Sequence, residues 1–212
     1  MKTGRNKALF LDRDGVINVD TGYVYRRESF EFIPGIFALC RAAQNMGYLL
    51  VVVTNQAGIA RGYYSESDFN DLTEWMIARF AEKQITITRV YYCPYHPVFG
   101  VGQFKCDSPN RKPNPGMLIR AQSDLDLELG SSILIGDKLS DLQAGCAAGV
   151  GTQILLSPER RELESQKISY HVSPSLDDIR STFFSPGNRF AQTQEAEQLP
   201  KTPCRKQVTP SL

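Results

Sequence analysis

Short apolar segments alternate with segments of helical period along most of this chain, and no other feature limits the possible folds as much. Five apolar or β-branched runs are predicted to be strands, at residues 8–11, 48–53, 87–92, 133–135 and 152–156. Helices are predicted between them, around residues 36–43, 65–80, 115–125 and 144–148. Strands that alternate with helices in this way form a parallel sheet covered on both faces, with right-handed crossovers. The sequence therefore predicts an α/β fold, a three-layer sandwich around a central, mostly parallel sheet.

Composition and charge exclude several classes of partner. The 212 residues suffice for one sizeable core, and nothing in the sequence demands a second domain. The formal net charge of +1 provides no basic surface for nucleic acid or for an anionic membrane. No segment approaches the roughly 20 consecutive apolar residues of a membrane-spanning helix. We therefore expect that the chain binds neither nucleic acid nor membrane and holds anionic ligands through local charges.

Cysteine usage and the polarity of the C-terminal segment bear on location and on domain bounds. The five cysteines are odd in number and widely spread, and no signal peptide precedes them, which indicates a reducing cytoplasm. From about Ser185 the chain is polar, contains four prolines and loses its periodicity. We expect one domain over residues 1–184 and a disordered tail over residues 185–212.

Two carboxylates follow the first predicted strand, in the sequence Asp12-Arg13-Asp14-Gly15. Ligands of parallel α/β sheets bind at the carboxyl ends of the strands, so Asp12 and Asp14 are expected to face a binding site. Gly15 permits a sharp turn and keeps side-chain bulk away from a ligand. On its own, this pattern is equally typical of a strand followed by an acidic turn. The segment 16–33 has no sustained period, and we expect it either to cover the site or to be a solvated excursion.

Three further segments with polar groups follow predicted strands. They are Thr54-Asn55, the loop pair Arg111-Lys112, and the segment from Gly136-Asp137 to Asp141. A carboxylate cluster around a hard cation, together with hydroxyl and cationic donors for a phosphate, is what phosphoryl transfer requires. Each segment alone is typical of turn chemistry, a solvated loop or a helix cap. Their joint occurrence after strands predicts a site for phosphoryl transfer.

These four segments resemble the four motifs of the haloacid dehalogenase (HAD) superfamily of phosphatases, over residues 8–156. Longer stretches are similar to the D-glycero-D-manno-heptose 1,7-bisphosphate 7-phosphatase group, whose nearest relative is the histidinol-phosphate phosphatase. These stretches are Asp-Arg-Asp-Gly-Val-Ile-Asn at 12–18, Thr-Asn-Gln-Ala-Gly-Ile-Ala-Arg-Gly at 54–62 and Arg-Lys-Pro-Asn-Pro-Gly-Met at 111–117. The resemblance implies a HAD-like, Rossmann-like sandwich without a large cap domain. It also implies removal of the 7-phosphate of the heptose bisphosphate, in the biosynthesis of nucleotide-activated heptose for the lipopolysaccharide core.

By this resemblance, Asp12 is the nucleophile that takes up the phosphoryl group as an aspartyl-phosphate. Asp14 is the general acid that protonates the leaving alkoxide and the general base that then deprotonates water. The neighbouring Asp12 favours the protonated form of Asp14 that the first step needs. Mg²⁺ is expected to bind the Asp12 carboxylate, the backbone carbonyl of Asp14 and Asp137, and to neutralise phosphate and nucleophile.

The resemblance also implies contacts with the phosphate and with the rest of the substrate. The Thr54 hydroxyl and the Asn55 backbone N–H are expected to bind phosphoryl oxygens, and Lys112 to balance their charge. Arg111 has a planar fork suited to a sugar hydroxyl or to a second phosphate. Weaker candidates for substrate binding are Asp20, Tyr23, Gln56, Arg61 and Lys138, with a plain surface role as the alternative for those at the rim. Asp141 is expected to orient Lys138 or its loop rather than to bind metal.

One departure from the group concerns the loop after the third predicted strand. Many members carry a structural zinc in a Cys-x-His…Cys-x-Cys pattern, but here Tyr95 stands at the histidine position and Ser108 (or Asn110) at the last cysteine position. Cys93, His96 and Cys106 remain, fewer than the four nitrogen or sulfur ligands of a structural zinc, and Asp107 is a further candidate. We expect a loop without zinc, held by packing and by turns at its prolines.

Two alternative functions stay open. Histidinol phosphate is the competing substrate within the same class of enzyme. A receiver-like signalling domain also uses an aspartyl-phosphate, Mg²⁺, a threonine and a lysine on a parallel sheet, but it retains its phosphate and lacks an acid two residues after the nucleophile. The pair of Asp12 and Asp14, with the late Asp137 segment, therefore favours a phosphatase. Compact members of the family are commonly monomers, so we expect a monomer.

Overall fold

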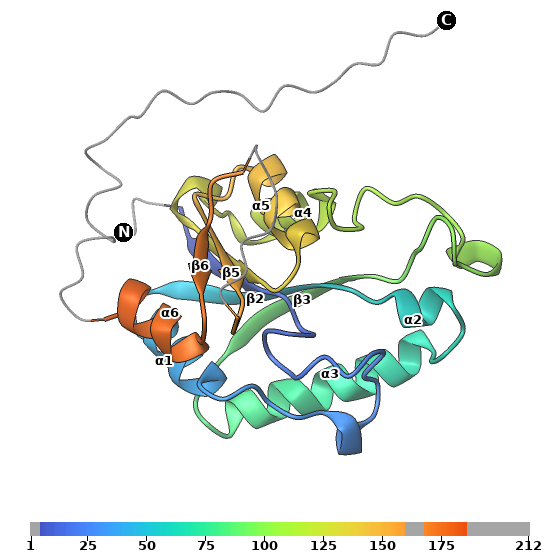
Figure 1. Ribbon diagram of the computed structural model, residues 1–212, viewed down its shortest axis with the longest axis horizontal. Coiled ribbons are helices and arrows are strands. Elements are labelled where there is room, and N and C mark those ends of the chain that lie inside the picture. The colour runs from blue at the N-terminus through green and yellow to red at the C-terminus, as the bar shows by residue number, and fades with distance from the viewer. Residues whose placement is uncertain (1–4, 160–167, 186–212) are drawn as a thin grey trace, which may run out of the picture.

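The central element of the fold is a six-stranded sheet in which every strand runs parallel to its neighbours (Figure 1). The computed structural model describes residues 5–159 and 168–185. The strands are β1 Lys7–Leu11, β2 Tyr48–Asn55, β3 Ile87–Cys93, β4 Ile133–Gly136, β5 Thr152–Leu156 and β6 His171–Ser173. Their order is β3-β2-β1-β4-β5-β6, so the chain moves outward from β1 to β3 on one side and through β4 to β6 on the other. The predicted α/β fold with a parallel sheet is confirmed.

Helices cover both faces of the sheet (Figure 1). On one face, α1 Ile36–Asn45, α3 Glu66–Ala81 and α6 Leu176–Phe183 share a buried apolar cluster with the strands. On the opposite face, α4 Gly116–Leu125 and α5 Leu139–Ala148 contribute to a second cluster. The short α2 Ala57–Ala60 follows β2, and the 3₁₀ segments are Arg27–Ser29, Gly102–Phe104 and Leu129–Ser131. Helices on both sides of one sheet give the predicted three layers.

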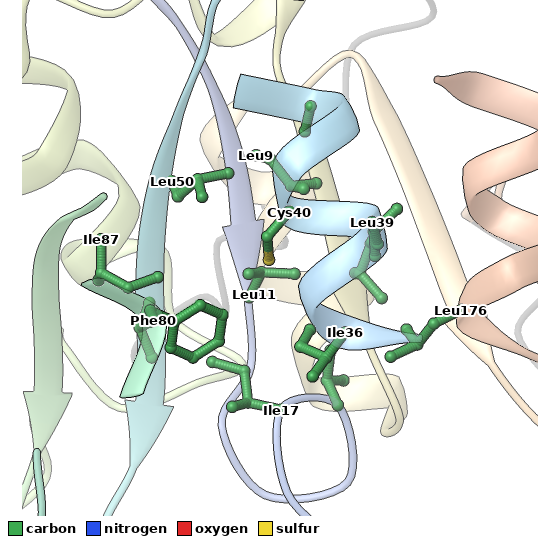
Figure 2. Close-up of a cluster of buried hydrophobic side chains, with 14 of the residues drawn as sticks. Leu9, Leu11, Ile17, Ile36, Leu39, Cys40, Leu50, Phe80, Ile87 and Leu176 are labelled. Atoms are coloured by element: carbon green, nitrogen blue, oxygen red, sulfur yellow. The ribbon is translucent and has the colours of Figure 1, made fainter. Parts of the chain in front are cut away.

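The two covered faces explain why β1 is apolar at nearly every position. Leu9 and Leu11 belong to the cluster with α1, α3 and α6, while Ala8 and Phe10 belong to the cluster with α4 and α5. All four side chains are completely buried. Figure 2 shows Leu9 and Leu11 beside Cys40 of α1. Because side chains alternate across a strand, a strand covered on both faces needs apolar residues at odd and even positions alike.

Helices α1 and α3 begin where the sequence pattern predicts. Gly35 precedes α1 with a φ of +90°, a backbone conformation that favours glycine. Ser65 caps α3, because its hydroxyl accepts the N–H of Asp68 while the Asp68 carboxylate accepts the N–H of Ser65 at 2.8 Å. Aspartate thus completes a capping box in which glutamate or glutamine is usual.

Two elements near the end of the described region were not predicted. Strand β6 has three residues and pairs with β5, and α6 follows it. A strand of three residues carries too little pattern to be recognised in the sequence, and its formation depends on the strand with which it pairs. The predicted tail lies outside the described residues except for Ser185.

The long connections at the carboxyl end of the sheet contain no inserted domain. Residues 12–35 link β1 to α1, and residues 94–115 link β3 to α4. Each contains one 3₁₀ segment as its regular secondary structure, which agrees with a fold that has no large cap. Within the ranges that the structure describes, no helix combines the length and apolar character needed to cross a bilayer.

Candidate active site

The carboxyl ends of three neighbouring strands bring the predicted site residues together. Strand β1 ends directly before Asp12, β2 ends with Thr54 and Asn55, and β4 ends directly before Asp137. These strands are adjacent in the order β2-β1-β4, and the N–H of Asp12 donates to a carbonyl of β4 at 3.0 Å. Lys112 reaches the same place from the β3–α4 connection. Residues from four separate segments of the sequence therefore meet at one edge of the sheet, as the strand order requires.

Three carboxylates form a compact group at this edge. One oxygen each of Asp12, Asp137 and Asp141 lies within 4.8 Å of the others. Two glycines make room for the group: a Cβ on Gly15 would lie 2.2 Å from Asp137 Oδ2, and a Cβ on Gly136 would lie 2.3 Å from Asp141 Cβ. Asp137 Oδ1 is buried and has no hydrogen-bond partner in the described part of the chain. A buried carboxylate oxygen without a partner is costly, so this atom is suited to a cation.

Lys112 provides the buried positive charge of this group. Its ammonium lies 2.9 Å from Asp12 Oδ1 and 2.5 Å from Asp141 Oδ1, and it donates to the Val53 carbonyl at 2.9 Å. Its three N–H groups are therefore engaged within the protein. The Asn55 side chain holds the connection in place through two hydrogen bonds with the Lys112 backbone, at 3.0 and 3.1 Å. Lys112 thus acts on the site through the charge that it places beside Asp12.

Burial and neighbouring charges determine how these groups ionise. Burial raises the pKa of Asp12, and the ion pair with Lys112 opposes this rise. Burial and the charge of Asp12 raise the pKa of Asp137 to about 7. Burial disfavours the charged form of Lys112, but Asp12 and Asp141 outweigh it and raise its pKa. When all three carboxylates are ionised, the single buried ammonium leaves the group with a negative net charge. This charge favours the binding of a divalent cation.

The carboxylate of Asp14 is held apart from this group by its own donors. Its Oδ1 accepts from Arg13 Nε at 3.2 Å, from Arg13 Nη2 at 2.9 Å and from Asn18 Nδ2 at 3.0 Å. Its Oδ2 accepts from Gln56 Nε2 at 3.2 Å. The backbone after Asp14 adjoins Asp137, as the close approach at Gly15 shows. The side chain and the backbone of Asp14 therefore serve different parts of the site.

Arg13 is a site residue that the sequence did not single out. It is only 1% exposed, and besides binding Asp14 its Nη2 donates to the Val24 carbonyl at 2.6 Å. Its guanidinium lies 5.6 Å from the ring centre of Phe69. Arg13 thus joins the acidic turn to the segment 16–33. The one sequence feature that could have indicated Arg13 is its place between two aspartates, directly after a buried strand.

Gln56 lies inside the site rather than at its rim. It is 1% exposed, its Nε2 donates to Thr54 Oγ1 at 2.9 Å as well as to Asp14, and its Oε1 accepts from the Tyr64 hydroxyl at 2.5 Å. Both ends of its amide are therefore engaged within the protein, and a direct contact of Gln56 with substrate stays a prediction. No feature of the sequence pointed to Tyr64.

The segment 16–33 contacts the site through Asp20. Lys138 Nζ lies 2.9 Å from Asp20 Oδ2 and 3.5 Å from Asp137 Oδ2, so two predicted rim residues pair with each other next to the carboxylate group. Asp141 orients the same turn, because its Oδ2 accepts the Lys138 N–H at 3.0 Å. Of the two expectations for this segment, these contacts favour a cover over the site.

A second part of the rim is cationic and aromatic. The Arg61 guanidinium lies 4.2 Å from the ring centre of Phe99 and 5.7 Å from that of Tyr23. Arg111 donates to the Tyr95 carbonyl at 3.2 Å. Burial and the charge of Arg61 lower the pKa of Arg111, which indicates that these two cations lie near each other. This part of the rim therefore offers positive charge to an anionic substrate.

Hydrogen bonds shape the β3–α4 connection at the candidate zinc positions. His96 Nδ1 accepts the N–H groups of Val98 and Phe99 at 3.2 and 3.1 Å, and Cys106 Sγ lies 3.5 Å from the Asp107 carbonyl oxygen. Over residues 5–159 and 168–185, the carboxylate group described above is the one set of three or more such side chains close enough for a single ion. A loop without zinc stays a prediction.

Known proteins are similar to this chain over most of its length. Residues 109–181 match the model of the HAD-hydrolase-like family. The chain is 59% identical over 152 residues to the D-glycero-alpha-D-manno-heptose-1,7-bisphosphate 7-phosphatase of Burkholderia mallei, covering 72% of this chain and 80% of the relative. It is 52% identical over 173 residues to the D-glycero-beta-D-manno-heptose-1,7-bisphosphate 7-phosphatase of Vibrio cholerae, covering 81% and 93%. A crystal structure of D,D-heptose 1,7-bisphosphate phosphatase from B. bronchiseptica, complexed with magnesium and phosphate, matches with a TM-score of 0.72 and 27% identity, covering 82% and 96%.

Proposed function

This chain belongs to the heptose-1,7-bisphosphate 7-phosphatase family of HAD-like phosphatases, and from that membership we propose that it hydrolyses the 7-phosphate of D-glycero-D-manno-heptose 1,7-bisphosphate. The observation that carries the proposal is the meeting of Asp12, Lys112 and Asp137 at one edge of the sheet, with Asp14 adjacent. We place this reaction in the cytoplasm, in the formation of nucleotide-activated heptose for the lipopolysaccharide core.

Asp12 is the proposed nucleophile. One of its carboxylate oxygens attacks phosphorus, and the bond between phosphorus and the sugar oxygen breaks as the aspartyl-phosphate forms. Lys112 favours the ionised carboxylate that this step needs, because the ion pair at 2.9 Å opposes the effect of burial on the pKa of Asp12. The covalent intermediate divides one difficult hydrolysis into two easier displacements.

Asp14 is the proposed carrier of the proton in both displacements. Its Oδ1 accepts three N–H groups and its Oδ2 accepts one, so Oδ2 is the atom with capacity to hold the transferred proton. From Oδ2 the proton passes to the leaving sugar oxygen. In the second displacement Asp14 takes a proton from the water that attacks the aspartyl-phosphate, which releases phosphate and restores the Asp12 carboxylate.

The phosphoryl oxygens are proposed to bind Thr54 and Asn55. Thr54 Oγ1 accepts a hydrogen bond from Gln56, which leaves the hydroxyl proton of Thr54 to be donated. Lys112 stabilises the transferring group by its charge, from its place beside Asp12. Arg111, which carries a planar fork of donors, is proposed to bind the remainder of the substrate, including a second phosphate.

The carboxylate group fits a hard divalent cation. Asp12 and Asp137 would hold Mg²⁺ with their carboxylates and Asp14 with its backbone carbonyl, while Asp141 is already engaged with Lys112. The fit is supported by Asp137 Oδ1, which is buried and has no protein partner among the described residues. When bound, Mg²⁺ would neutralise phosphate and nucleophile so that the two anions can approach each other.

The test is an assay of released phosphate with Mg²⁺ present. The substrates are both anomers of the heptose 1,7-bisphosphate, because the two relatives above are named for different anomers, and histidinol phosphate. We expect the highest kcat/KM with one heptose bisphosphate, a product that keeps its anomeric phosphate, and phosphate that accumulates in solution. Faster turnover of histidinol phosphate would replace the proposed substrate. Phosphate that stays on the protein would indicate a receiver-like domain instead.

A further inference from the structure

The amide of Gln56 links two groups to which the proposed function assigns different tasks. Its Nε2 donates to Thr54 Oγ1 at 2.9 Å and to Asp14 Oδ2 at 3.2 Å. Gln56 and Thr54 are each only 1% exposed. One buried side chain therefore contacts both the hydroxyl assigned to the phosphate and the carboxyl assigned to proton transfer.

The chemistry of the neighbours fixes the orientation of this amide. The NH₂ group of Gln56 faces Asp14 and Thr54, since its Nε2 donates to Asp14 Oδ2 and to Thr54 Oγ1. The carbonyl end then faces Tyr64, whose hydroxyl donates to Gln56 Oε1 at 2.5 Å. Burial raises the pKa of Tyr64 to about 12, so this hydroxyl keeps the proton that it donates. Tyr64 thus selects the orientation in which both N–H groups of Gln56 point into the site.

Tyr64 is itself held by packing. Its ring stacks on the ring of Tyr25, with 5.1 Å between centres and 10° between planes. On another side it touches Gly58, where an added Cβ would lie 2.1 Å from the Tyr64 ring. Tyr64 is buried, so the group that donates to Gln56 has little freedom to move.

From these contacts we propose that Gln56, locked by Tyr64, is a positioning residue that fixes the Thr54 hydroxyl and the Asp14 carboxyl relative to each other for phosphoryl transfer. One N–H occupies a lone pair of Thr54 Oγ1, so the hydroxyl proton is directed away from Gln56 and toward a phosphoryl oxygen. The other N–H holds Asp14 Oδ2, the oxygen with capacity for the transferred proton. This inference rests on the proposed function, because it assigns Gln56 a task only in phosphomonoester hydrolysis.

The two linked tasks respond differently to the leaving group. An alkyl phosphate releases a basic alkoxide and needs the proton from Asp14, whereas p-nitrophenyl phosphate releases a weakly basic phenolate and needs it far less. The contribution of Thr54 to phosphate binding is common to both substrates. A residue that only stabilises the fold would affect both substrates equally.

The experiment compares Gln56→Leu and Tyr64→Phe with wild type on two substrates, p-nitrophenyl phosphate and the alkyl phosphate of the assay above that wild type turns over fastest. We expect Gln56→Leu to lower kcat about 100-fold on the alkyl phosphate and about 10-fold on p-nitrophenyl phosphate. Tyr64→Phe, which removes one oxygen atom and keeps the stacked ring, is expected to lower kcat about 10-fold on the alkyl phosphate and by a smaller factor on p-nitrophenyl phosphate.

Matched controls remove the same chemical groups elsewhere. Gln153→Leu removes a buried amide that donates to the Val150 carbonyl at 2.7 Å, and Tyr92→Phe removes a hydroxyl that donates to Glu66 at 2.8 Å. Both are expected to leave the ratio of the two kcat values unchanged. Thermal unfolding of every variant checks that it is folded, and if Gln56→Leu does not fold, Tyr64→Phe decides.

Three outcomes are distinct. A larger loss on the alkyl phosphate supports the positioning role of Gln56. Equal losses on both substrates, or no loss in a folded variant, would overturn that role and leave the proposed function intact. A wild-type protein that releases phosphate from neither substrate would overturn the proposed function, and this inference with it.

Discussion

At the scale of single residues, the site depends on how the two buried carboxylates of Asp12 and Asp141 share the Lys112 ammonium, with the partly buried Asp137 beside them. Lys112 lies between Asp12 and Asp141, whereas Asp137 pairs through its Oδ2 with the more exposed Lys138 ammonium at 3.5 Å. A buried ion pair contributes little net stability, because desolvation of the charges offsets their attraction. The arrangement is better explained by chemistry: Asp141 helps to keep Lys112 charged, and Lys112 in turn favours ionised Asp12.

The role of Asp12 can be tested by a near-isosteric change. Asp12→Asn is expected to lower kcat by several orders of magnitude, because the amide is a poor nucleophile, while the chain stays folded because Lys112 keeps Asp141 as its partner. The measurement is kcat with thermal unfolding of the same sample. Asp124→Asn, which changes a carboxylate beside Arg89, is the control with unchanged kcat. Retention of more than about a hundredth of wild-type kcat would argue against covalent catalysis through Asp12.

The raised pKa of Asp137 predicts how pH affects metal binding and stability. Mg²⁺ requires the ionised carboxylate, so its affinity is expected to fall by up to about tenfold per unit as the pH drops below about 7. Without metal, the folded chain retains a proton on Asp137 that the unfolded chain releases, so stability falls as the pH rises from about 4 to about 7.

Calorimetric titration with Mg²⁺ at pH 5.5, 6.5 and 7.5 measures the first effect, and urea unfolding of metal-free protein at the same values measures the second. Asp137→Asn is the control, for which both dependences should weaken. Affinity for Mg²⁺ that stays constant over this range would contradict the assignment of Asp137 as a metal ligand.

At the scale of elements, the β3–α4 connection has to hold Arg111 and Lys112 in place. The carbonyl of buried Ser108 accepts two hydrogen bonds, from the Arg111 N–H at 3.0 Å and from Asn114 Nδ2 at 2.9 Å. The Arg111 guanidinium ties the other end of the connection through the Tyr95 carbonyl. The resemblance places zinc ligands at the positions of Tyr95 and Ser108 (or Asn110), and in this chain the carbonyls of Tyr95 and Ser108 accept hydrogen bonds.

This connection predicts a zinc content below one ion per chain. The zinc content of protein purified without a metal-affinity tag is measured by elemental analysis. Treatment with a chelator, followed by restoring Mg²⁺, is expected to leave the thermal midpoint unchanged. Cys106→Ser is the matched variant, with no expected change in thermal midpoint because the thiol is exposed. One zinc per chain, lost in Cys106→Ser, would show that Cys106 belongs to a metal site.

At the scale of the whole molecule, both apolar clusters depend on the same sheet. Strand β1 contributes Leu9 and Leu11 to one cluster and Ala8 and Phe10 to the other, so neither cluster can form without it. The groups proposed for catalysis stand at the carboxyl ends of β1 and its two neighbours. Loss of either cluster would therefore move the strand ends on which the site is built.

We accordingly predict that the described region unfolds in a single transition. The single tryptophan, Trp75, packs against the cluster of α1, α3 and α6, so its fluorescence reports on that face, while circular dichroism reports on all helices. The two midpoints are expected to coincide in urea. Phe10 lies on the opposite face, and Phe10→Ala should lower the unfolding free energy by about 3–5 kcal/mol. Both midpoints should therefore move together to lower urea concentration. Separate midpoints would indicate two independently folding layers.

Much of the fold could be predicted because its signals are local. The runs at 8–11 and 48–53 are apolar throughout, and the stripe from Phe69 to Phe80 repeats at helical spacing, so strand and helix follow from neighbouring residues alone. Strand β6 could not be predicted, because three residues carry no period and their stability comes from pairing with β5.

The kinds of side chain in the site could be predicted from the sequence, but the hydrogen bonds and ion pairs between them could not. Polar residues directly after apolar runs marked Asp12, Thr54 and Asp137 as strand-end groups. The resemblance predicts Gln56 as a weaker candidate for substrate binding, but nothing in the sequence indicates its hydrogen bond to Tyr64, a residue that lies beyond α2. The choice of a hydrogen-bond partner depends on which side chains meet in space, and that is not encoded within one segment.

The amino-acid sequence by itself determined where strands β1 to β5 form and end, and which acidic, hydroxyl and cationic groups stand at those ends. Each of these follows from the preferences of adjacent residues. The tertiary structure alone decided that Lys112 lies between Asp12 and Asp141, and that Arg13 and Gln56 hold Asp14. It also decided that, among residues 5–159 and 168–185, Asp137 Oδ1 has no partner. The physical reason is that these contacts join residues brought together by the strand order β2-β1-β4 and by packing, so their geometry exists only once the sheet has formed.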